Sequence, residues 1–312
     1  MCCRLCTVAE LERCISRIEL VVRSHTEFKV LVEDLLNELL FELNLRNKKN
    51  YIKLDCNCKT LFIGDVHGDY YTLLSVLEKT SALEALRSGG YIVFLGDYID
   101  RGDEQIRTLA LVALLKTEWR DRVVLLRGNH EPLPHLMPSP HDFPFRLIES
   151  FGSSNAEELY ATLQKVFEAL PLILYMPKRL VALHGGPPVA RLMRYSDPED
   201  ILSVDSNDYE DVLWSDPSED VENYEFNFVR GAGVLWGPRV TDEFLKKTGV
   251  RVVVRGHEPC NGYKFNHGGK VLTLFSMKGY YGNRYAGALA VDTKELLDNS
   301  ISEYIRKNIV LI

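Results

Sequence analysis

The stretch YIVFLGDYIDRG, from Tyr91 to Gly102, carries the pattern from which the fold can be predicted. Its first five residues are aromatic, β-branched or aliphatic, and they predict a short buried strand that stops at Gly96. Two aspartates and an arginine follow within five positions. In open α/β sheets, ligands bind beyond the carboxyl ends of the strands, so these charged side chains stand where chemistry can take place. A solvated acidic turn uses the same residue types, so this stretch alone leaves both interpretations open.

The same pattern recurs in four more stretches. They read LFIGDVHGD at 61–69, VVLLRGNHE at 123–131, LVALHGG at 180–186 and VRVVVRGHE at 250–258. Each apolar run ends at a glycine beside Asp, Asn or His, so the loops would converge on one rim rich in oxygen and imidazole ligands. Helical patterns at 69–86 and 104–119 separate the first three strands and predict a βαβαβ unit with a parallel sheet.

The remainder of the chain supplies helices and closing strands. Apolar residues recur at the helical period from Val8 to Leu45, which predicts two or three helices packed on the outside of the core, with partner binding as the alternative use. We therefore divide the chain into a helical extension, residues 1–50, and a catalytic domain, residues 51–312. Five prolines in the segment 131–145 predict an irregular loop running past the site. Further predictions are a helix at 155–170, hairpins at 172–183 and 264–275, and closing strands at 286–291 and 301–305.

The composition excludes several classes of protein. The formal net charge is −7 and the pI is near 5.7, whereas non-specific nucleic-acid binding needs a basic face. No apolar run approaches the ~20 residues of a membrane span. Charged residues interrupt the apolar pattern at the N-terminus, so no secretory signal is expected and the expected compartment is the cytoplasm. The segment 197–225 contains no Lys or Arg and is either a solvated acidic insertion or an element of substrate selection.

The chain has seven cysteines, six of them before residue 60. The spacings Cys3-x-x-Cys6 and Cys56-x-Cys58 are compatible with a zinc or iron–sulfur site, because thiolates at such spacings suit soft metals. No histidine pair accompanies them. Reduced thiols, or a stabilising disulfide if the source is a hyperthermophile, are therefore the simpler interpretations.

Taken together, the glycine-containing motifs resemble a known family. GDVHG, GDYIDRG, RGNHE, HGG and RGHE, in this order and at these spacings, are similar to the phosphoprotein phosphatase family of metal-dependent serine/threonine phosphatases, within the wider calcineurin-like metallophosphoesterases. The match covers roughly residues 59–292. LWSDP at 213–217, and TLFS at 273–276 followed by Tyr280, indicate the protein phosphatase branch. The resemblance implies an α/β fold of the calcineurin-like metallophosphoesterase type, a central β-sandwich flanked by helices.

The resemblance also implies a site for two divalent metal ions. Mixed carboxylate, amide and imidazole ligands without cysteine suit manganese, the first expectation, or iron or zinc. Two ions ~3.5–4 Å apart can share a carboxylate and a water whose pKa falls toward ~7. The expected reaction is therefore direct attack by a hydroxide that bridges the two metal ions, with no phosphoenzyme. The implied ligands are Asp65 and His67 for one ion, Asn129, His184 and His257 for the other, and Asp97 as the bridge.

The resemblance to the family also implies roles for the remaining site residues. His130 would donate a proton to the leaving alkoxide, and Asp100 would hold its ring and favour the imidazolium, so these two are the implied catalytic residues. Arg101 and Arg230 resemble the family's phosphate clamp, since guanidinium groups match phosphoryl oxygens in fork geometry. Tyr280 resembles the tyrosine that overhangs the site. The expected partners are phosphorylated protein substrates; the sequence identifies no regulatory subunit.

The sequence departs from the family pattern around the substrate surface. Pro187-Pro188 follows HGG where Leu-Ser-Pro is usual, SMKGY at 276–280 replaces SAPNY, and the segment 132–151 does not resemble the usual sequence after GNHE. Such departures, with the long N-terminal helices, suggest an archaeal or otherwise divergent phosphatase. A hydrolase of dinucleoside polyphosphates or other small phosphoesters is the first alternative, because GD-x-HG and GNHE also occur there. A non-catalytic scaffold is the second, and the intact set of expected ligands argues against it.

Overall fold

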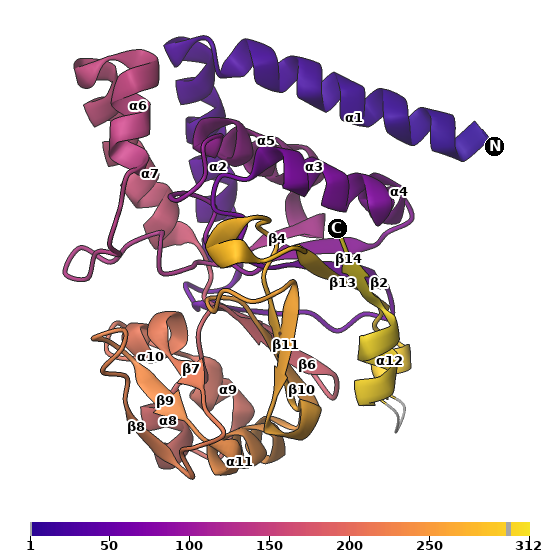
Figure 1. The fold of residues 1–312 in the computed structure, drawn as a ribbon, viewed down its shortest axis with the longest axis vertical. Helices are drawn as coiled ribbons and strands as arrows, with labels where there is room; N and C mark the ends of the chain where they lie inside the picture. The colour runs from indigo at the N-terminus through magenta and orange to yellow at the C-terminus, as the bar shows by residue number, and fades with distance from the viewer. Residues whose placement is uncertain (1, 298–300) are drawn as a thin grey trace.

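The computed structural model describes residues 2–297 and 301–312, and its elements form four layers: helices, a sheet, a second sheet and further helices (Figure 1). Clusters of buried apolar residues fill the spaces between the layers. Phe62 and Val93 point between the sheets, where they join Leu174, while their neighbours Leu61 and Ile92 point toward the helices. This alternation follows from the two-residue period of a strand. The predicted fold class, a β-sandwich flanked by helices, is confirmed.

The first sheet has the strand order β14-β13-β2-β3-β4. Strands β2, β3 and β4 are parallel, which confirms the predicted βαβαβ unit, and β13 and β14 extend the sheet in antiparallel fashion. The bounds are β2 (Lys59–Ile63), β3 (Tyr91–Phe94), β4 (Val123–Leu125), β13 (Gly287–Asp292) and β14 (Ile309–Leu311).

The second sheet has the order β1-β5-β6-β10-β12-β11. Its central strands β6, β10 and β12 are parallel, whereas β5 with β6 and β11 with β12 form the two predicted hairpins. The bounds are β1 (Tyr51–Lys53), β5 (Ile173–Met176), β6 (Leu180–Leu183), β10 (Val252–Arg255), β11 (Tyr263–Asn266) and β12 (Val271–Leu274).

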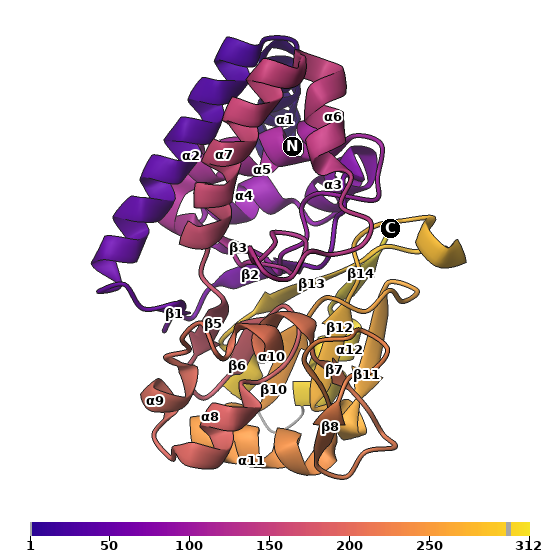
Figure 2. The same ribbon diagram turned by 90° about the vertical axis from the view of Figure 1, so that its left-hand side faces the viewer.

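Helices α1 to α7 cover the outer face of the first sheet (Figure 2). The N-terminal segment forms two of them, and the apolar face of α2 enters the core shared by β2 and β3 through Phe28, Leu31 and Leu35. Asp69 caps α3 by accepting a hydrogen bond from the Thr72 N–H. The bounds are α1 (Cys2–Val21), α2 (His25–Leu45), α3 (Tyr70–Lys79), α4 (Ala82–Arg87), α5 (Gln105–Trp119), α6 (Phe143–Phe151) and α7 (Ser153–Ala169).

The outer layer on the second sheet contains short helices and a small sheet of order β7-β9-β8 (Figure 2). The acidic segment 197–225 folds into part of this layer. The bounds are α8 (Val189–Arg194), α9 (Pro198–Leu202), α10 (Tyr209–Trp214), β7 (Asp216–Pro217), β8 (Tyr224–Phe226), β9 (Val234–Trp236) and α11 (Pro238–Thr248). Short 3-10 segments are η1 (Arg120–Arg122), η2 (His267–Gly269), η3 (Tyr280–Gly282) and η4 (Glu295–Leu297).

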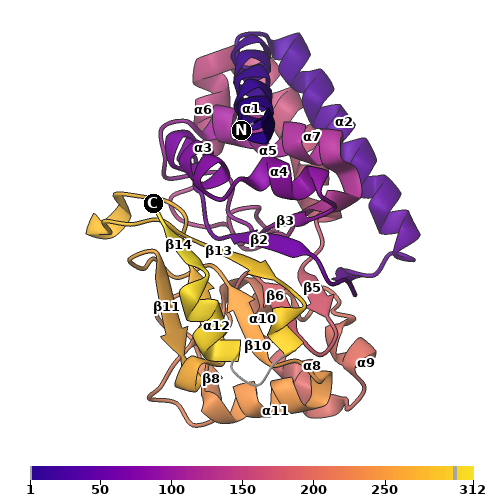
Figure 3. The ribbon, with the colours of Figure 1, turned by 90° about the vertical axis from the view of Figure 1, so that its right-hand side faces the viewer.

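Two predicted elements were wrong. The segment expected as a closing strand at 301–305 is helix α12 (Ile301–Lys307), and Figure 3 shows it leading into the true closing strand β14. Its apolar residues Ile301, Tyr304 and Ile305 pack on the core at helical spacing. The single crossover helix expected at 69–86 is broken into α3 and α4 at Ser81, whose φ of 51° is left-handed.

Two further features concern the cysteines and the apolar character of the helices. Cys56 and Cys58 form a disulfide, which agrees with the disulfide interpretation for that pair. The side chains of Cys3 and Cys6 lie outside the part of the chain described. Among residues 2–297 and 301–312, no helix has both the length and the apolar character needed to cross a membrane.

Candidate active site

The loops that follow β2, β3 and β4 in one sheet meet the loops that follow β6 and β10 in the other. A cavity of about 340 Å³ lies where they meet. The convergence of the five motifs on one rim is confirmed, although the rim draws on both sheets instead of one. The cavity brings together residues predicted from the sequence: His67, Asp97, Arg101, Asn129, His130, Arg230, His257 and Tyr280.

The backbone of these loops is strained at the predicted residues. Non-glycine residues with left-handed φ values include His67 (41°), Asp97 (57°), Asp100 (65°), Arg101 (74°) and His257 (70°). Each such conformation costs of order 1–3 kcal/mol and persists only where surrounding contacts impose it. Strain of this kind gathers at functional sites, and here it coincides with the motifs.

Two motif glycines allow the backbone to approach the carboxylates. A Cβ at Gly128 would lie 2.2 Å from Asp97 Oδ1, and a Cβ at Gly256 would lie 2.3 Å from Asp65 Oδ1. Any side chain at either position would displace a carboxylate of the site. The close approach allows two hydrogen bonds from the backbone. The His257 N–H donates to Asp65 Oδ1 at 2.9 Å, and the His130 N–H donates to Asp97 Oδ1 at 2.8 Å.

Two buried histidines direct a ring nitrogen at Asp97. His67 Nδ1 donates to the Ile99 carbonyl at 2.9 Å, and His67 Nε2 lies 3.3 Å from Asp97 Oδ2. His184 Nδ1 donates to the Leu95 carbonyl at 2.9 Å, and His184 Nε2 lies 3.4 Å from the same Asp97 oxygen. A carbonyl oxygen only accepts, so Nδ1 carries the proton in both rings. Hydrogen bonds of this kind orient metal-ligating histidines and fix their tautomer.

The remaining predicted ligands complete two groups around Asp97. Asn129 Oδ1 lies 2.9 Å from His184 Nε2 and 3.0 Å from His257 Nδ1. On the other side, Asp65 Oδ2 lies 3.9 Å from His67 Nε2. All six predicted ligands are buried. Donor atoms that lie within 4.8 Å of one another form the groups His67, Asp97, His130 and Asp97, His184, His257.

The electrostatics of this cluster favour the binding of cations. Burial lowers the pKa of His67 and His184 well below the usual value, so both rings are neutral and direct lone pairs at Asp97. Burial raises the pKa of Asp97, and the carboxylates of Asp65 and Glu131 raise it further by repulsion. Even a protonated Asp97 could donate to only one of the two rings. Metal ions between these donors would remove the repulsion, so the residues fit a buried binuclear metal site of His and Asp ligands.

Glu131 joins the loop that follows β3 to the loop that follows β4. Its buried carboxylate accepts hydrogen bonds from the N–H groups of Asp97, Tyr98 and Gly128, at 2.8–2.9 Å. Arg127 donates to the carbonyl of Glu131 at 2.8 Å. Glu131 and Arg127 therefore hold the loops that carry Asp97 and Asn129 in place.

His130 and Asp100 are in direct contact beside the predicted metal ligands. His130 Nδ1 lies 2.6 Å from Asp100 Oδ2, so His130 Nε2 is directed into the cavity. Burial acts to raise the pKa of Asp100, but hydrogen bonds from His130 and His141 outweigh it and hold that pKa below its usual range. Arg101 Nη2 lies 3.3 Å from His130 Nε2 and donates to the Ser139 carbonyl at 3.1 Å.

Arg230 and Tyr280 also line the cavity. Arg230 Nε donates to Asp216 Oδ2 at 2.9 Å, and the other oxygen of Asp216 accepts from the buried Arg255 at 3.0 Å. The Tyr280 ring lies 6.3 Å from the His67 ring, centroid to centroid. The cavity is therefore lined by two guanidinium groups and a phenol in addition to the predicted metal ligands.

Sequence reasoning gave no role to two residues that the site uses. Asp216 belongs to the LWSDP motif, and its presence in a family motif was the signal available. His141 lies in the proline-rich loop, and its ring contacts Asp100 at 2.7 Å. That contact joins residues 41 positions apart, which no local pattern reveals.

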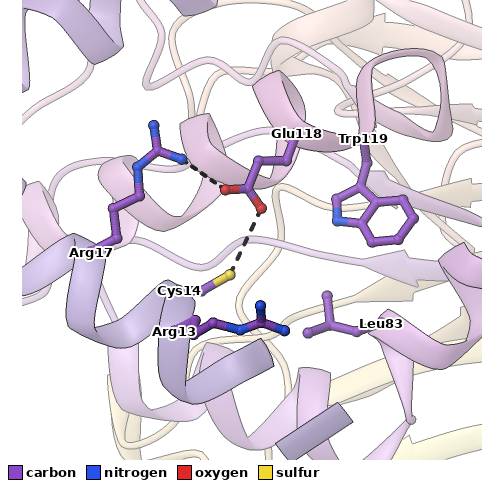
Figure 4. Close-up of a pocket in the computed structure, with 6 residues that line it drawn as sticks. All are labelled: Arg13, Cys14, Arg17, Leu83, Glu118 and Trp119. Atoms are coloured by element: carbon purple, nitrogen blue, oxygen red, sulfur yellow. Dashed lines mark hydrogen bonds and ion pairs between the residues drawn. The ribbon is translucent and has the colours of Figure 1, made fainter. Parts of the chain in front are cut away.

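A second pocket, of about 350 Å³, lies between α1, α4 and α5 (Figure 4). Arg17 Nη1 pairs with Glu118 Oε1 at 2.8 Å across it. No histidine is found among those of its lining residues that the structure describes. This pocket therefore lacks the ligand set of the first. Its described lining consists of Arg13, Cys14, Arg17, Leu83, Glu118 and Trp119.

Comparisons with known proteins agree with this geometry. The profile of the calcineurin-like phosphoesterases matches residues 58–261. The catalytic subunit of serine/threonine-protein phosphatase 4 from Saccharomyces cerevisiae is 31% identical over 76% of this chain and 74% of its own length. A protein of Encephalitozoon cuniculi described as a probable serine/threonine-protein phosphatase is 30% identical over 88% of this chain, which spans 63% of that relative.

Solved structures show the same fold. A serine/threonine phosphatase from Saccharomyces cerevisiae, with similarity to human phosphatase PP5, superposes with a TM-score of 0.70 at 22% identity, covering 93% of this chain and 89% of that one. A cold-active protein-tyrosine phosphatase of a Shewanella species gives a TM-score of 0.52 at 20% identity, over 78% of this chain and 77% of its own. At these identities the likeness is one of fold alone.

The fold and the buried His and Asp cluster define a metallophosphoesterase. The chain belongs to the calcineurin-like phosphoesterase family, as a metal-dependent serine/threonine protein phosphatase. The relatives named above do not support the archaeal source suggested by the sequence departures, because both come from eukaryotes.

Proposed function

We propose that this chain hydrolyses phosphoserine and phosphothreonine esters of proteins, with Asp65 and His67 holding one metal ion, Asn129, His184 and His257 the other, and Asp97 bridging them. When bound, the two ions would supply Lewis acidity and lower the pKa of a water toward neutrality. Manganese is the proposed occupant, with iron and zinc as alternatives, because the ligand set has no thiolate. The cytoplasmic location stays a prediction from the sequence.

The other site residues would act on the substrate directly. Arg101 and Arg230 would bind the phosphoryl oxygens and offset the charge that develops on them. Asp216 supports this role for Arg230, because its carboxylate holds the guanidinium at the cavity wall. Tyr280 would cover the bound phosphate from the outer side of the cavity.

His130 would protonate the leaving oxygen of the serine or threonine. The contact from its Nδ1 to Asp100 supports this role, since it leaves Nε2 on the cavity side. The group in contact with that Nε2 is the Arg101 guanidinium, at 3.3 Å. Binding of a phosphate by Arg101 would draw this guanidinium toward the phosphoryl oxygens and leave Nε2 to face the ester oxygen.

The observation that carries the proposal is the meeting of a neutral-imidazole and carboxylate cluster with two guanidinium groups in one cavity. The first needs cations and the second needs an anion, and a phosphate ester on two metal ions satisfies both.

The test compares two substrate classes on one protein preparation. The chain is stripped of metal, supplied with manganese, and assayed with phosphoserine and phosphothreonine peptides beside diadenosine tetraphosphate. We expect manganese-dependent turnover of the peptides to exceed that of the dinucleotide. A preference for the dinucleotide would replace the proposed substrate with a small phosphoester, and inactivity on both would contradict the enzymatic role.

A further inference from the structure

We propose that His141 is a positioning residue for the reaction, which acts through Asp100 to hold His130 in the orientation that protonates the leaving group. This inference rests on the proposed function and adds to it a residue from the segment that departs from the family pattern. The supporting observation is that one buried carboxylate is shared by two imidazole rings.

The Asp100 carboxylate is fully engaged by three donors. His130 Nδ1 lies 2.6 Å and His141 Nδ1 lies 2.7 Å from the same oxygen, Oδ2. The other oxygen, Oδ1, accepts from the Phe143 N–H at 2.9 Å. The Asp100 side chain has no exposed surface, so in the intact chain these protein donors, and not bulk water, fix its orientation. The orientation of the carboxylate, and with it that of His130, therefore depends on His141.

His141 is itself held from a helix outside the site. Its Nε2 lies 2.7 Å from the Tyr160 hydroxyl, which projects from α7. The ionised Asp100 carboxylate only accepts, so His141 Nδ1 is the donor to it. Burial raises the pKa of Tyr160 to about 12, so the phenol that contacts His141 Nε2 stays protonated. A chain of hydrogen bonds therefore runs from Tyr160 through His141 and Asp100 to His130.

The segment that contains His141 also forms hydrogen bonds with Arg101, the residue after Asp100. Asp142 Oδ1 accepts from the Arg101 N–H at 3.2 Å, and the Ser139 carbonyl accepts from the Arg101 guanidinium at 3.1 Å. Asp100 and Arg101 both have left-handed φ values, which need such contacts to persist. Residues 139–143 therefore hold the general-acid pair and one arm of the phosphate clamp together.

The proposal predicts a defect confined to one part of the reaction. A hydroxide oxygen forms the new bond to phosphorus, the ester P–O bond breaks, and the Nε2 proton of a His130 imidazolium passes to the departing oxygen, which leaves as the alcohol. A serine alkoxide is strongly basic and needs this proton in the transition state. A p-nitrophenolate ion is a weak base and leaves without it. Loss of His141 should therefore slow the first substrate much more than the second.

The experiment measures kcat on a phosphoserine peptide and on p-nitrophenyl phosphate with the manganese-loaded full chain. For His141→Ala we expect a fall of about 10–100-fold on the peptide and less than about 3-fold on p-nitrophenyl phosphate. His141→Asn keeps an N–H near the position of Nδ1 and should recover most of the peptide activity. Tyr160→Phe should give a smaller fall on the peptide, and His135→Ala, in an exposed part of the same loop, should change neither rate.

Manganese titration of His141→Ala supplies a readout independent of turnover. We expect two ions per chain at wild-type affinity, because His141 contacts no predicted ligand. Equal falls on both substrates, weakened manganese binding, or an unchanged rate on the peptide would each overturn the assignment of His141 while leaving the proposed function intact. A wild-type chain that turns over p-nitrophenyl phosphate but no phosphopeptide would overturn the proposed function, and this inference with it.

Discussion

Replacement of Glu131 by Gln tests whether a single buried carboxylate holds the loops that follow β3 and β4. The three backbone N–H groups that donate to it come from the β3 loop and the β4 loop. A glutamine keeps one acceptor oxygen and sets an NH₂ group against at least one of the three donors. An unsatisfied buried donor costs about 1–3 kcal/mol, and the remaining bonds lose the strength that the negative charge gives them. We therefore expect Glu131→Gln to lower the free energy of unfolding by about 2–4 kcal/mol.

The assay is urea unfolding of the manganese-loaded protein at pH 8. In the metal-free chain burial raises the pKa of Glu131 and makes its charge a net cost, whereas cations bound beside Asp97 would favour the carboxylate, so the loaded protein is the form in which its hydrogen bonds stabilise the loops. Glu149→Gln is the matched control, since Glu149 is about half exposed and pairs with Arg146 at the surface; its effect should stay below about 0.5 kcal/mol. Manganese affinity should also fall about 10–100-fold in Glu131→Gln, because the carboxylate supports the Asp97 loop. Equal free energies of unfolding for Glu131→Gln and Glu149→Gln would contradict the supporting role of the Glu131 carboxylate.

Three further predictions concern other parts of the molecule. His130→Asn should reduce kcat on a phosphoserine peptide by about 10²–10⁴-fold, and near wild-type turnover would contradict its role as general acid. Glu42→Gln should cost about 1–3 kcal/mol in thermal or urea unfolding, because its contact with the buried Lys116 ammonium ties α2 to α5, whereas Glu38→Gln should cost less than about 1 kcal/mol. Burial raises the pKa of Asp211 to about 6, so the folded chain keeps a proton that the unfolded chain releases, and stability falls as pH rises from about 4 to 6; Asp211→Asn should therefore add about 1–3 kcal/mol at pH 8 and almost nothing at pH 4 in urea unfolding.

The motif strands were predictable because each carries its signal locally. A buried strand of a sandwich is apolar on both faces, and the abrupt change to glycine and a polar ligand marks its carboxyl end. The same order of motifs was enough to bring Asp65, Asp97 and Asn129 together, since parallel neighbouring strands end at one edge. The helix at 301–307 was missed because a short apolar run fits both periods, and the packing of Ile301 and Ile305 decided between them.

The rest of the site depends on contacts between distant segments. Helix α6, which begins at Phe143, was hidden by the prolines around it, and the shared carboxylate of Asp100 could not be read from either segment alone. The small sheet β7-β9-β8 is made of strands of two or three residues, too short for a period to appear. The division of the chain at residue 50 stays a prediction, although α2 packs in the same core as β2.

Calorimetric titration of the metal-stripped chain with manganese, for the wild type and for Asp97→Asn, decides whether the site holds two metal ions. We expect two ions per wild-type chain and, in the variant, binding weakened by at least about 100-fold at one or both sites, because Asp97 faces both groups of ligands. Two ions bound by Asp97→Asn with unchanged affinity would contradict the bridging role and the two-metal site built around it.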